Sequence, residues 1–179
     1  MIKIILVALA VIILVFVVVV VLQPADFRIA RSATIAAPPA AVFEQVNDLH
    51  KFQTWNPWAK IDPTARNTFA GPSAGVGSSF SWAGNNDVGE GTMTVTGSQP
   101  GELVRFKMEF KKPFEATNTA EFTFKPEGDQ TVVTWSMTGT NGFMGKAMSL
   151  IMNCDKMVGG SFEKGLADLK SLVEASNKK

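Results

Sequence analysis

The sequence is poor in the side chains that build most catalytic and metal centres. It has no tyrosine, one cysteine and one histidine in 179 residues. A single cysteine excludes a disulfide or a multi-thiolate site within these residues, and a single histidine excludes a histidine-rich metal centre. A lone histidine, His50, is thin evidence for an acyl-transfer triad, so such a triad is not indicated. We therefore predict no bound metal and no cofactor.

Charge of one sign is not concentrated anywhere in the chain. The formal net charge is +1, and the lysines and arginines are spread out, so the basic stripe typical of a nucleic-acid interface is missing. The glycines at 75–77 and 89–91 do not extend to Gly-x-Gly-x-x-Gly, and no Gly-Lys-Ser/Thr follows them. We therefore expect neither a nucleic acid nor a nucleotide as partner.

Polar side chains are also missing from residues 4–22, which are apolar throughout. As a helix this run is about 28 Å long, close to the roughly 30 Å hydrocarbon core of a bilayer. A cleaved signal peptide is the alternative, but its apolar region is about 7–15 residues long and precedes a small-x-small site, which residues 22–26 do not offer. We predict an uncleaved single-pass membrane anchor over 1–24 and one folded domain over 25–179.

Few charges flank this run, so the orientation of the anchor rests on weak signals. Lys3 precedes it, and Arg28 and Arg31 follow it, which makes the positive-inside count nearly balanced. Very short leading segments usually stay in the cytosol. We therefore expect the domain on the non-cytoplasmic side, periplasmic or extracellular.

Alternating apolar and polar residues predict strands over much of the remaining chain. A first strand is expected near 27–35, then two short helices at 37–46 and 49–55, and then strands from about 69 to 140. In the clearest run, 103–111, four apolar residues alternate with charged ones, as in a half-buried antiparallel strand. Glycine, proline and asparagine turn signals separate the runs. We predict an antiparallel sheet of six to seven strands with one apolar face.

The last predicted element is one long helix over 145–175. On a helical wheel, an apolar stripe lies within about 40° of Phe162 and would pack on the sheet. The stripe consists of Met148, Ile151, Val158, Leu166, Leu169 and Val173. Gly159 and Gly160 interrupt the helix at a cost of about 1 kcal/mol each relative to alanine. A bend or a close backbone approach is expected there.

Several short motifs occur in the same order as these elements: IAAP at 35–38, VF at 42–43, WNPW at 55–58, GVG at 75–77 and GGSFEKGLADLK at 159–170. Together they resemble the START and birch-pollen-allergen (SRPBCC) superfamily, and most closely its polyketide cyclase/dehydrase-like branch. The resemblance implies an α+β helix-grip fold, in which a curved antiparallel sheet wraps a long C-terminal helix and leaves an apolar cavity. The superfamily includes lipid carriers, cyclases, hormone receptors and chaperone cofactors, so the fold alone does not choose the function.

Strand parity, the helical wheel and this resemblance together give a candidate cavity lining. Its members are Trp55, Trp58, Phe80, Trp82, Met93, Phe106, Met108, Asn118, Phe122, Trp135, Met137, Met148, Met152, Asp155 and Phe162. The methionines suit either an adaptable apolar lining or ordinary core filling. Trp55 and Trp58 flank Pro57, where the second short helix must break. They either line the cavity entrance or cap the core under a loop.

Two polar residues of this set are the candidates for chemistry. Asp155 falls within the apolar stripe of the last helix, where burial would raise the pKa of its carboxyl group. It is either a polar anchor or general acid/base in the cavity, or a structural carboxylate that meets other donors or solvent. Asn118 shares inward parity with Ala120, so its amide either binds a ligand or satisfies a backbone group near the strand end.

Three functions fit these observations. We favour a membrane-tethered binding or carrier domain for an apolar small molecule such as a lipid, a quinone or a polyketide-like compound. The first alternative is a cyclase/dehydrase-type enzyme that uses Asp155 and Asn118. The second is a protein-interaction module, related to chaperone-activating domains, whose core is filled.

Overall fold

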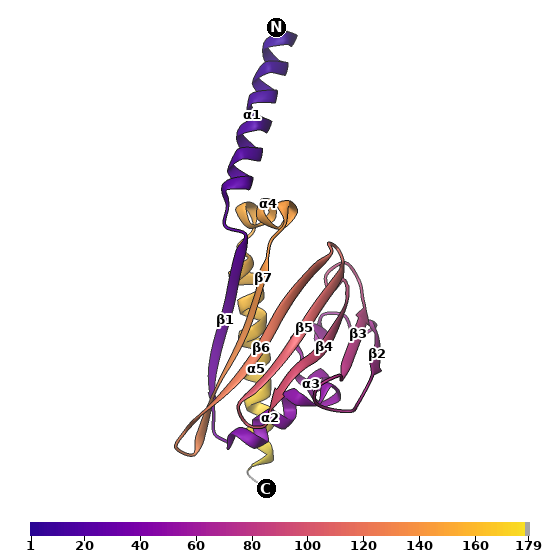
Figure 1. The fold of residues 1–179 in the computed structure, drawn as a ribbon, viewed down its shortest axis with the longest axis vertical. Coiled ribbons are helices and arrows are strands. Elements are labelled where there is room, and N and C mark those ends of the chain that lie inside the picture. Colours follow the sequence, from indigo (N-terminus) through magenta and orange to yellow (C-terminus); the bar gives the residue numbers. More distant parts are fainter. Residues whose placement is uncertain (178–179) are drawn as a thin grey trace.

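A computed structural model describes residues 1–177 as an N-terminal helix followed by an α+β domain (Figure 1). The helices are α1 (Ile2–Leu22), α2 (Pro39–Asn47), α3 (Leu49–Trp55), α4 (Phe143–Ile151) and α5 (Cys154–Ser176), with a 3-10 helix η1 (Pro57–Lys60). The strands are β1 (Asp26–Ile35), β2 (Arg66–Ala70), β3 (Ser79–Ala83), β4 (Glu90–Gln99), β5 (Leu103–Lys112), β6 (Ala116–Glu127) and β7 (Gln130–Thr140). The predicted α+β class is confirmed.

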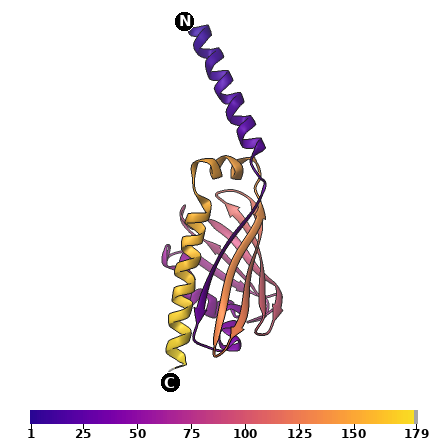
Figure 2. The same ribbon diagram turned by 90° about the vertical axis from the view of Figure 1, so that its left-hand side faces the viewer.

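The strands form one antiparallel sheet in the order β1-β7-β6-β5-β4-β3-β2. Each strand from β2 to β7 pairs with its neighbours in the chain, and β1 joins the open edge of β7. The sheet curves around α5, which runs along its concave face (Figures 1 and 2). This is the predicted helix-grip architecture, and the alternating residues of the strands place their apolar side chains against α5.

The two short helices close the end of the grip that is far from α1 (Figure 1). Pro39 occupies the first turn of α2, where its missing N–H has no intrahelical partner to lose. The Asp48 side chain caps α3 by accepting hydrogen bonds from the backbone N–H groups of His50 and Lys51. α3 ends at Trp55 because the next residue precedes a proline. Both helices lie where the sequence predicts them.

The C-terminal helix is two helices, not the single one predicted over 145–175. The helix is interrupted at Met152 and Asn153. The Asn153 side chain caps the start of α5 by accepting a hydrogen bond from the backbone N–H of Lys156. Met148 and Ile151 therefore belong to α4, and Ile151 is 79% exposed. The rest of the stripe is correct, because the side chains that pack on the sheet from α5 are Phe162, Leu166, Leu169 and Val173.

A close approach of β1 explains Gly159. The Arg31 guanidinium of β1 lies against this glycine, and a β-carbon there would overlap it. Arg31 donates from Nη2 to Asp155 Oδ2 at 2.9 Å and from Nε to Glu163 Oε1 at 2.7 Å. An added β-carbon at Gly160 meets nothing within 4 Å. The expected close approach is thus present at the first glycine, where it clamps α5 to β1.

The helix α1 is long and apolar enough to cross a membrane, a property that N-terminal signal sequences share. Its C-terminal end meets α4, which lies across it in both views (Figures 1 and 2). Lys146 of α4 donates from Nζ to the carbonyl oxygen of Val21 at 3.2 Å, and Val20 is fully buried. After residues 23–25 the chain enters β1 directly.

Candidate functional site

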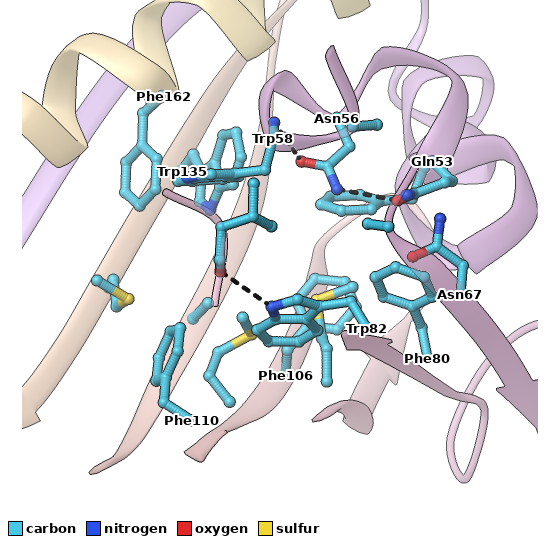
Figure 3. A pocket seen from close by; sticks show the side chains of 18 of the residues that line it. Gln53, Asn56, Trp58, Asn67, Phe80, Trp82, Phe106, Phe110, Trp135 and Phe162 are labelled. Atoms are coloured by element: carbon cyan, nitrogen blue, oxygen red, sulfur yellow. Dashed lines mark hydrogen bonds between the residues drawn. The ribbon is translucent and has the colours of Figure 1, made fainter. Parts of the chain in front are cut away.

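An apolar cavity of about 210 Å³ lies between the sheet and α5 (Figure 3). Most of its lining is aromatic or aliphatic, and polar side chains occur at one side only. The lining residues are Phe52, Gln53, Asn56, Trp58, Ala59, Asp62, Ala65, Asn67, Phe80, Trp82, Val88, Met93, Phe106, Met108, Phe110, Ala120, Phe122, Trp135, Met137, Val158 and Phe162. They come from α3, η1, the loop between η1 and β2, the sheet with its β3–β4 loop, and the first half of α5.

Stacked rings form one wall of the cavity. Trp135 of β7 lies between Phe122 and Phe162, with ring centroids 4.7 Å and 4.1 Å away. Trp58 meets the rings of Trp135 and Phe162 edge-on at 5.8 Å and 6.2 Å. Gly165 makes room for this stack, because a β-carbon there would lie 2.8 Å from the Trp135 ring. Such edge-to-face and stacked pairs hold a rigid wall.

Trp82 of β3 forms the wall at the other side of the cavity. Its ring stacks on Phe80 at 6.0 Å and meets Phe110 edge-on at 5.8 Å, and its Nε1 donates to the carbonyl oxygen of Val88 at 3.3 Å. A β-carbon on Gly91 would lie 2.5 Å from this indole ring. Glycine at this position therefore lets the indole lie flat over β4.

Side-chain amides form most of the polar side, where Figure 3 shows Gln53, Asn56 and Asn67. Together with Asp62, which also lines the cavity, we call them the polar rim. Asn56 donates from Nδ2 to Gln53 Oε1 at 2.9 Å, and its Oδ1 accepts from the backbone N–H of Trp58 at 3.2 Å. These bonds orient Asn56, while the amide nitrogen of Gln53 and the exposed amide of Asn67 are placed to meet a polar group at the opening.

Asp62 is the only ionisable residue among those that line the cavity. Its Oδ1 accepts from the hydroxyl and backbone N–H of Thr64 at 2.7 Å and 3.0 Å, and its Oδ2 accepts from the backbone N–H of Asn85 at 2.8 Å. The hydrogen bonds from Thr64 and then from Asn85 lower the pKa of this carboxyl group. At neutral pH it is a carboxylate that joins two loops and has no proton to give as a general acid.

The structure brings ten of the fifteen sequence-predicted residues together around the cavity. They are Trp58, Phe80, Trp82, Met93, Phe106, Met108, Phe122, Trp135, Met137 and Phe162. The polar rim was missed, because it lies on α3, η1 and the loop up to β2, where no strand period exists to assign a face. The Asp62-x-Thr64 spacing, which is typical of an aspartate-capped turn, was the one available signal for Asp62.

Trp55, Asn118 and Met148 do not line the cavity. Trp55 is 2% exposed and donates from Nε1 to the carbonyl oxygen of Gln45 at 3.0 Å, as a core residue does. Asn118 lies on the inner side of β6 beyond the cavity, and its Nδ2 is 3.9 Å from the sulfur of Met137. Met148 is on α4, which does not reach the cavity.

Asp155 does not line the cavity, and it takes the second of its two expected roles, that of a structural carboxylate that meets another donor and solvent. Its side chain is 61% exposed and pairs with Arg31, which lowers the pKa of the carboxyl group, first through the hydrogen bond. The helical wheel places Asp155 on the side of α5 that faces the sheet. Arg31 shares strand parity with Ile29, and it pairs with Asp155 at the edge of the sheet. Asp155 and Met152 instead line a more open groove of about 700 Å³ between β1 and the α4–α5 link.

This groove and the cavity share a wall. Met137 of β7 and Val158 of α5 line both of them. The groove begins at the α4 end of the domain, where Leu150 and Ile151 contribute to its lining. The side chains of Met137 and Val158 thus separate the cavity from a groove whose lining includes α4, the helix that contacts α1.

A seven-stranded antiparallel sheet that grips a C-terminal helix around an apolar cavity defines the helix-grip class of ligand-binding domains. The chain belongs to the family described as polyketide cyclase/dehydrase and lipid transport, whose model matches residues 26–174. The resemblance seen in the sequence is therefore confirmed. A comparison with curated protein sequences finds no significant match.

Solved structures of several proteins share the fold at low sequence identity. Protein CV1439 from Chromobacterium violaceum is 16% identical, with a TM-score of 0.60 over 85% of this chain and 99% of that one. The Aha1 dimer from Colwellia psychrerythraea is 17% identical, with a TM-score of 0.60 over 83% and 96%. The di-domain ARO/CYC protein StfQ from the steffimycin biosynthetic pathway is 11% identical, with a TM-score of 0.61 over 87% and 53%. At such identities the likeness concerns the fold.

Proposed function

We propose that this protein is a membrane-tethered binding or carrier domain for an apolar small molecule. The observation that carries the proposal is the cavity, whose lining is almost entirely apolar and whose few polar groups are gathered at one rim. This is the usual constitution of a small-molecule site, in which apolar walls give affinity and a few polar groups fix orientation. The lipid-transport part of the family description agrees with such a role.

The size of the cavity limits the ligand. An engineered protein cavity of about 150 Å³ holds benzene, and sites for larger ligands measure about 300–1,000 Å³. At about 210 Å³, this cavity fits one or two rings or a short chain. A longer molecule would keep its remainder outside, with a carbonyl or hydroxyl group against Gln53 and Asn67 at the polar rim.

The tether is α1. Its end packs on α4 and receives a hydrogen bond from Lys146, which gives it a role in the folded protein that a removed signal sequence would not have. A domain held at a bilayer also works at a high local concentration of the apolar compounds that partition there. The very short segment before α1, of a kind that usually stays in the cytosol, favours the non-cytoplasmic side for the domain.

The two other functions receive less support from the geometry. A cyclase or dehydrase needs convergent polar groups inside the cavity, but Asp155 and Asn118 lie outside it and Asp62 is held by Thr64 and Asn85. An interaction module of the kind considered above needs a filled core, which the open volume beside Trp58 and Trp135 disfavours.

Native mass spectrometry of the full chain, released from mild detergent, tests the proposal. We expect a discrete added mass that is lost on denaturation. The control is Ala120→Leu, which places a larger side chain in the cavity and leaves α1 unchanged. A mass lost in the variant was in the cavity, whereas a mass kept by both proteins is lipid held on α1. No added mass, even after incubation with lipid and quinone mixtures, contradicts the binding role.

A further inference from the structure

The helix α4 is apolar on one side and has almost nothing to pack against. Although all nine of its residues are described, none is buried, and α1 is the element it mainly contacts. Four large side chains lie within about 120° of one another on its wheel and are exposed. We call them the α4 apolar face: Phe143, Met144, Leu150 and Ile151. Lys146 lies at the border of this face, about 40° beyond Leu150, and Ser149 lies on the other side.

The position of α4 along α1 is fixed by contacts. The Lys146 hydrogen bond to the carbonyl oxygen of Val21 and the burial of Val20 place α4 level with the last turn of α1. α1 has 21 residues, which gives a length of about 31 Å, close to the thickness of a bilayer core. If α1 spans the membrane, its last turn lies where the acyl chains meet the headgroups. α4 then lies at that level too.

The direction of α4 suits this level. α4 runs across the axis of α1 in both views (Figures 1 and 2), so it lies roughly in the plane of a membrane that α1 crosses. An amphipathic helix in this plane buries its apolar side about 5–10 Å into the boundary between headgroups and acyl chains. Its lysine matches the surroundings, because a long cationic side chain reaches polar groups from an apolar site.

A second exposed aromatic residue lies at the same end of the domain. Phe114 is in the β5–β6 turn, and it is exposed. The register Asn118–Gly139 shows that this turn and the end of β7, which leads into α4, lie at one end of the sheet. Phe114 and the α4 apolar face thus lie at the end from which α1 leaves, while Ile61, Val76 and Leu172 are exposed singly elsewhere in the domain.

From these observations we infer that α4 is a membrane-surface helix, whose apolar face lies in the leaflet next to the domain. This inference rests on the tether in the proposed function and goes beyond it. The domain then contacts the bilayer in two places, through α1 and through α4, and the groove that shares Met137 and Val158 with the cavity opens at the lipid surface.

Site-directed spin labelling of the full chain in phosphatidylcholine nanodiscs tests the inference. Cys154 is exposed and is the only cysteine, so Cys154→Ser gives a background without reactive thiols. One label is placed at Ile151→Cys, where 79% exposure means that no packed side chain is lost. A matched control is Asp129→Cys, in the exposed β6–β7 turn at the far end of the sheet. A third label at Val11→Cys reports on α1.

The accessibility of each label to oxygen and to a water-soluble nickel chelate gives its depth. We expect the label at 151 about 5–10 Å below the phosphate level, the label at 11 near the bilayer centre and the label at 129 in water. If the label at position 151 is as accessible to the chelate as the label at position 129, while the label at position 11 lies in the bilayer, the inference about α4 is wrong and the tether still holds. A label at 11 in water overturns the tether. Spin–spin broadening at 151 with shielding from both reagents means that a second copy of the chain covers α4, and also overturns the inference.

Discussion

Replacing Ala120 by leucine distinguishes an open cavity from a filled core. Ala120 is in the middle of β6, 5% exposed, and its strand partners are Phe106 and Met137. All three line the cavity. Leucine adds three carbons, and at about 0.8 kcal/mol for each buried CH₂ the upper limit of stabilisation is about 2.4 kcal/mol. In a filled core the same change would instead cost about 1–3 kcal/mol through overpacking.

The matched control is Ala37→Leu. Ala37 is as buried as Ala120 but does not line the cavity, so its replacement should lower the free energy of unfolding by about 1–3 kcal/mol. Urea unfolding of the full chain is followed by tryptophan fluorescence, since all four tryptophans lie in the domain. We expect the urea concentration at the unfolding midpoint to stay the same or rise for Ala120→Leu and to fall for Ala37→Leu.

Ligand binding is the second measurement on the Ala120→Leu and Ala37→Leu variants. Naphthalene has two rings and is a suitable probe for a cavity of about 210 Å³, and quenching of tryptophan fluorescence reports its binding. Ala120→Leu should weaken binding at least about tenfold, which corresponds to about 1.4 kcal/mol, while Ala37→Leu should leave it unchanged. Equal destabilisation by the two substitutions, with equal naphthalene affinity, would refute the cavity argument.

Three further substitutions test other parts of the structure. Asp155→Asn should leave naphthalene binding unchanged and slightly lower the melting temperature at pH 7. Because Arg31 lowers the pKa of Asp155, the stability from this pair is present above about pH 3.9 and is lost as the pH falls through the lowered pKa. The difference in melting temperature between the two proteins should therefore vanish in acid. Trp58→Ala removes two edge-to-face contacts of about 0.5–1.5 kcal/mol each, and it should speed naphthalene release in stopped-flow fluorescence by more than the loss of stability predicts. A β-carbon at Gly91 would overlap the Trp82 ring and the backbone carbonyl oxygen of Glu109, so Gly91→Ala should shift both and weaken naphthalene binding. Gly97→Ala on the same strand meets only ordinary contacts and should bind naphthalene as the unchanged protein does.

The sequence predicts the sheet and the two short helices well because their signals are local. The charged residues that alternate with Phe106 and Met108 assign both faces of β5, and Pro57 determines where α3 ends. The break before α5 was missed for a physical reason. Met152 and Asn153 fit a helical wheel, and only the capping bond of Asn153 to Lys156 shows that a new helix starts there.

The cavity was predicted better on its strands than at its opening. Parity gives the inward side of a strand, but the loop from η1 to β2 has no such period, so the polar rim with Asp62 and Asn67 depends on tertiary contacts. For Asp155, the position on the helix could be predicted but its partner could not. Its place on α5 was predictable, but the arginine that meets it comes from β1, more than a hundred residues earlier in the chain.

The short connection between α1 and β1 restricts where this domain can act. Residues 23–25 reach at most about 10 Å even when fully extended. With α1 in a bilayer, the domain therefore cannot carry a ligand across the gap to another membrane, as a domain on a long flexible linker can. Under the proposed function, the domain would bind its ligand only at the membrane that holds α1. Any acceptor must come to it.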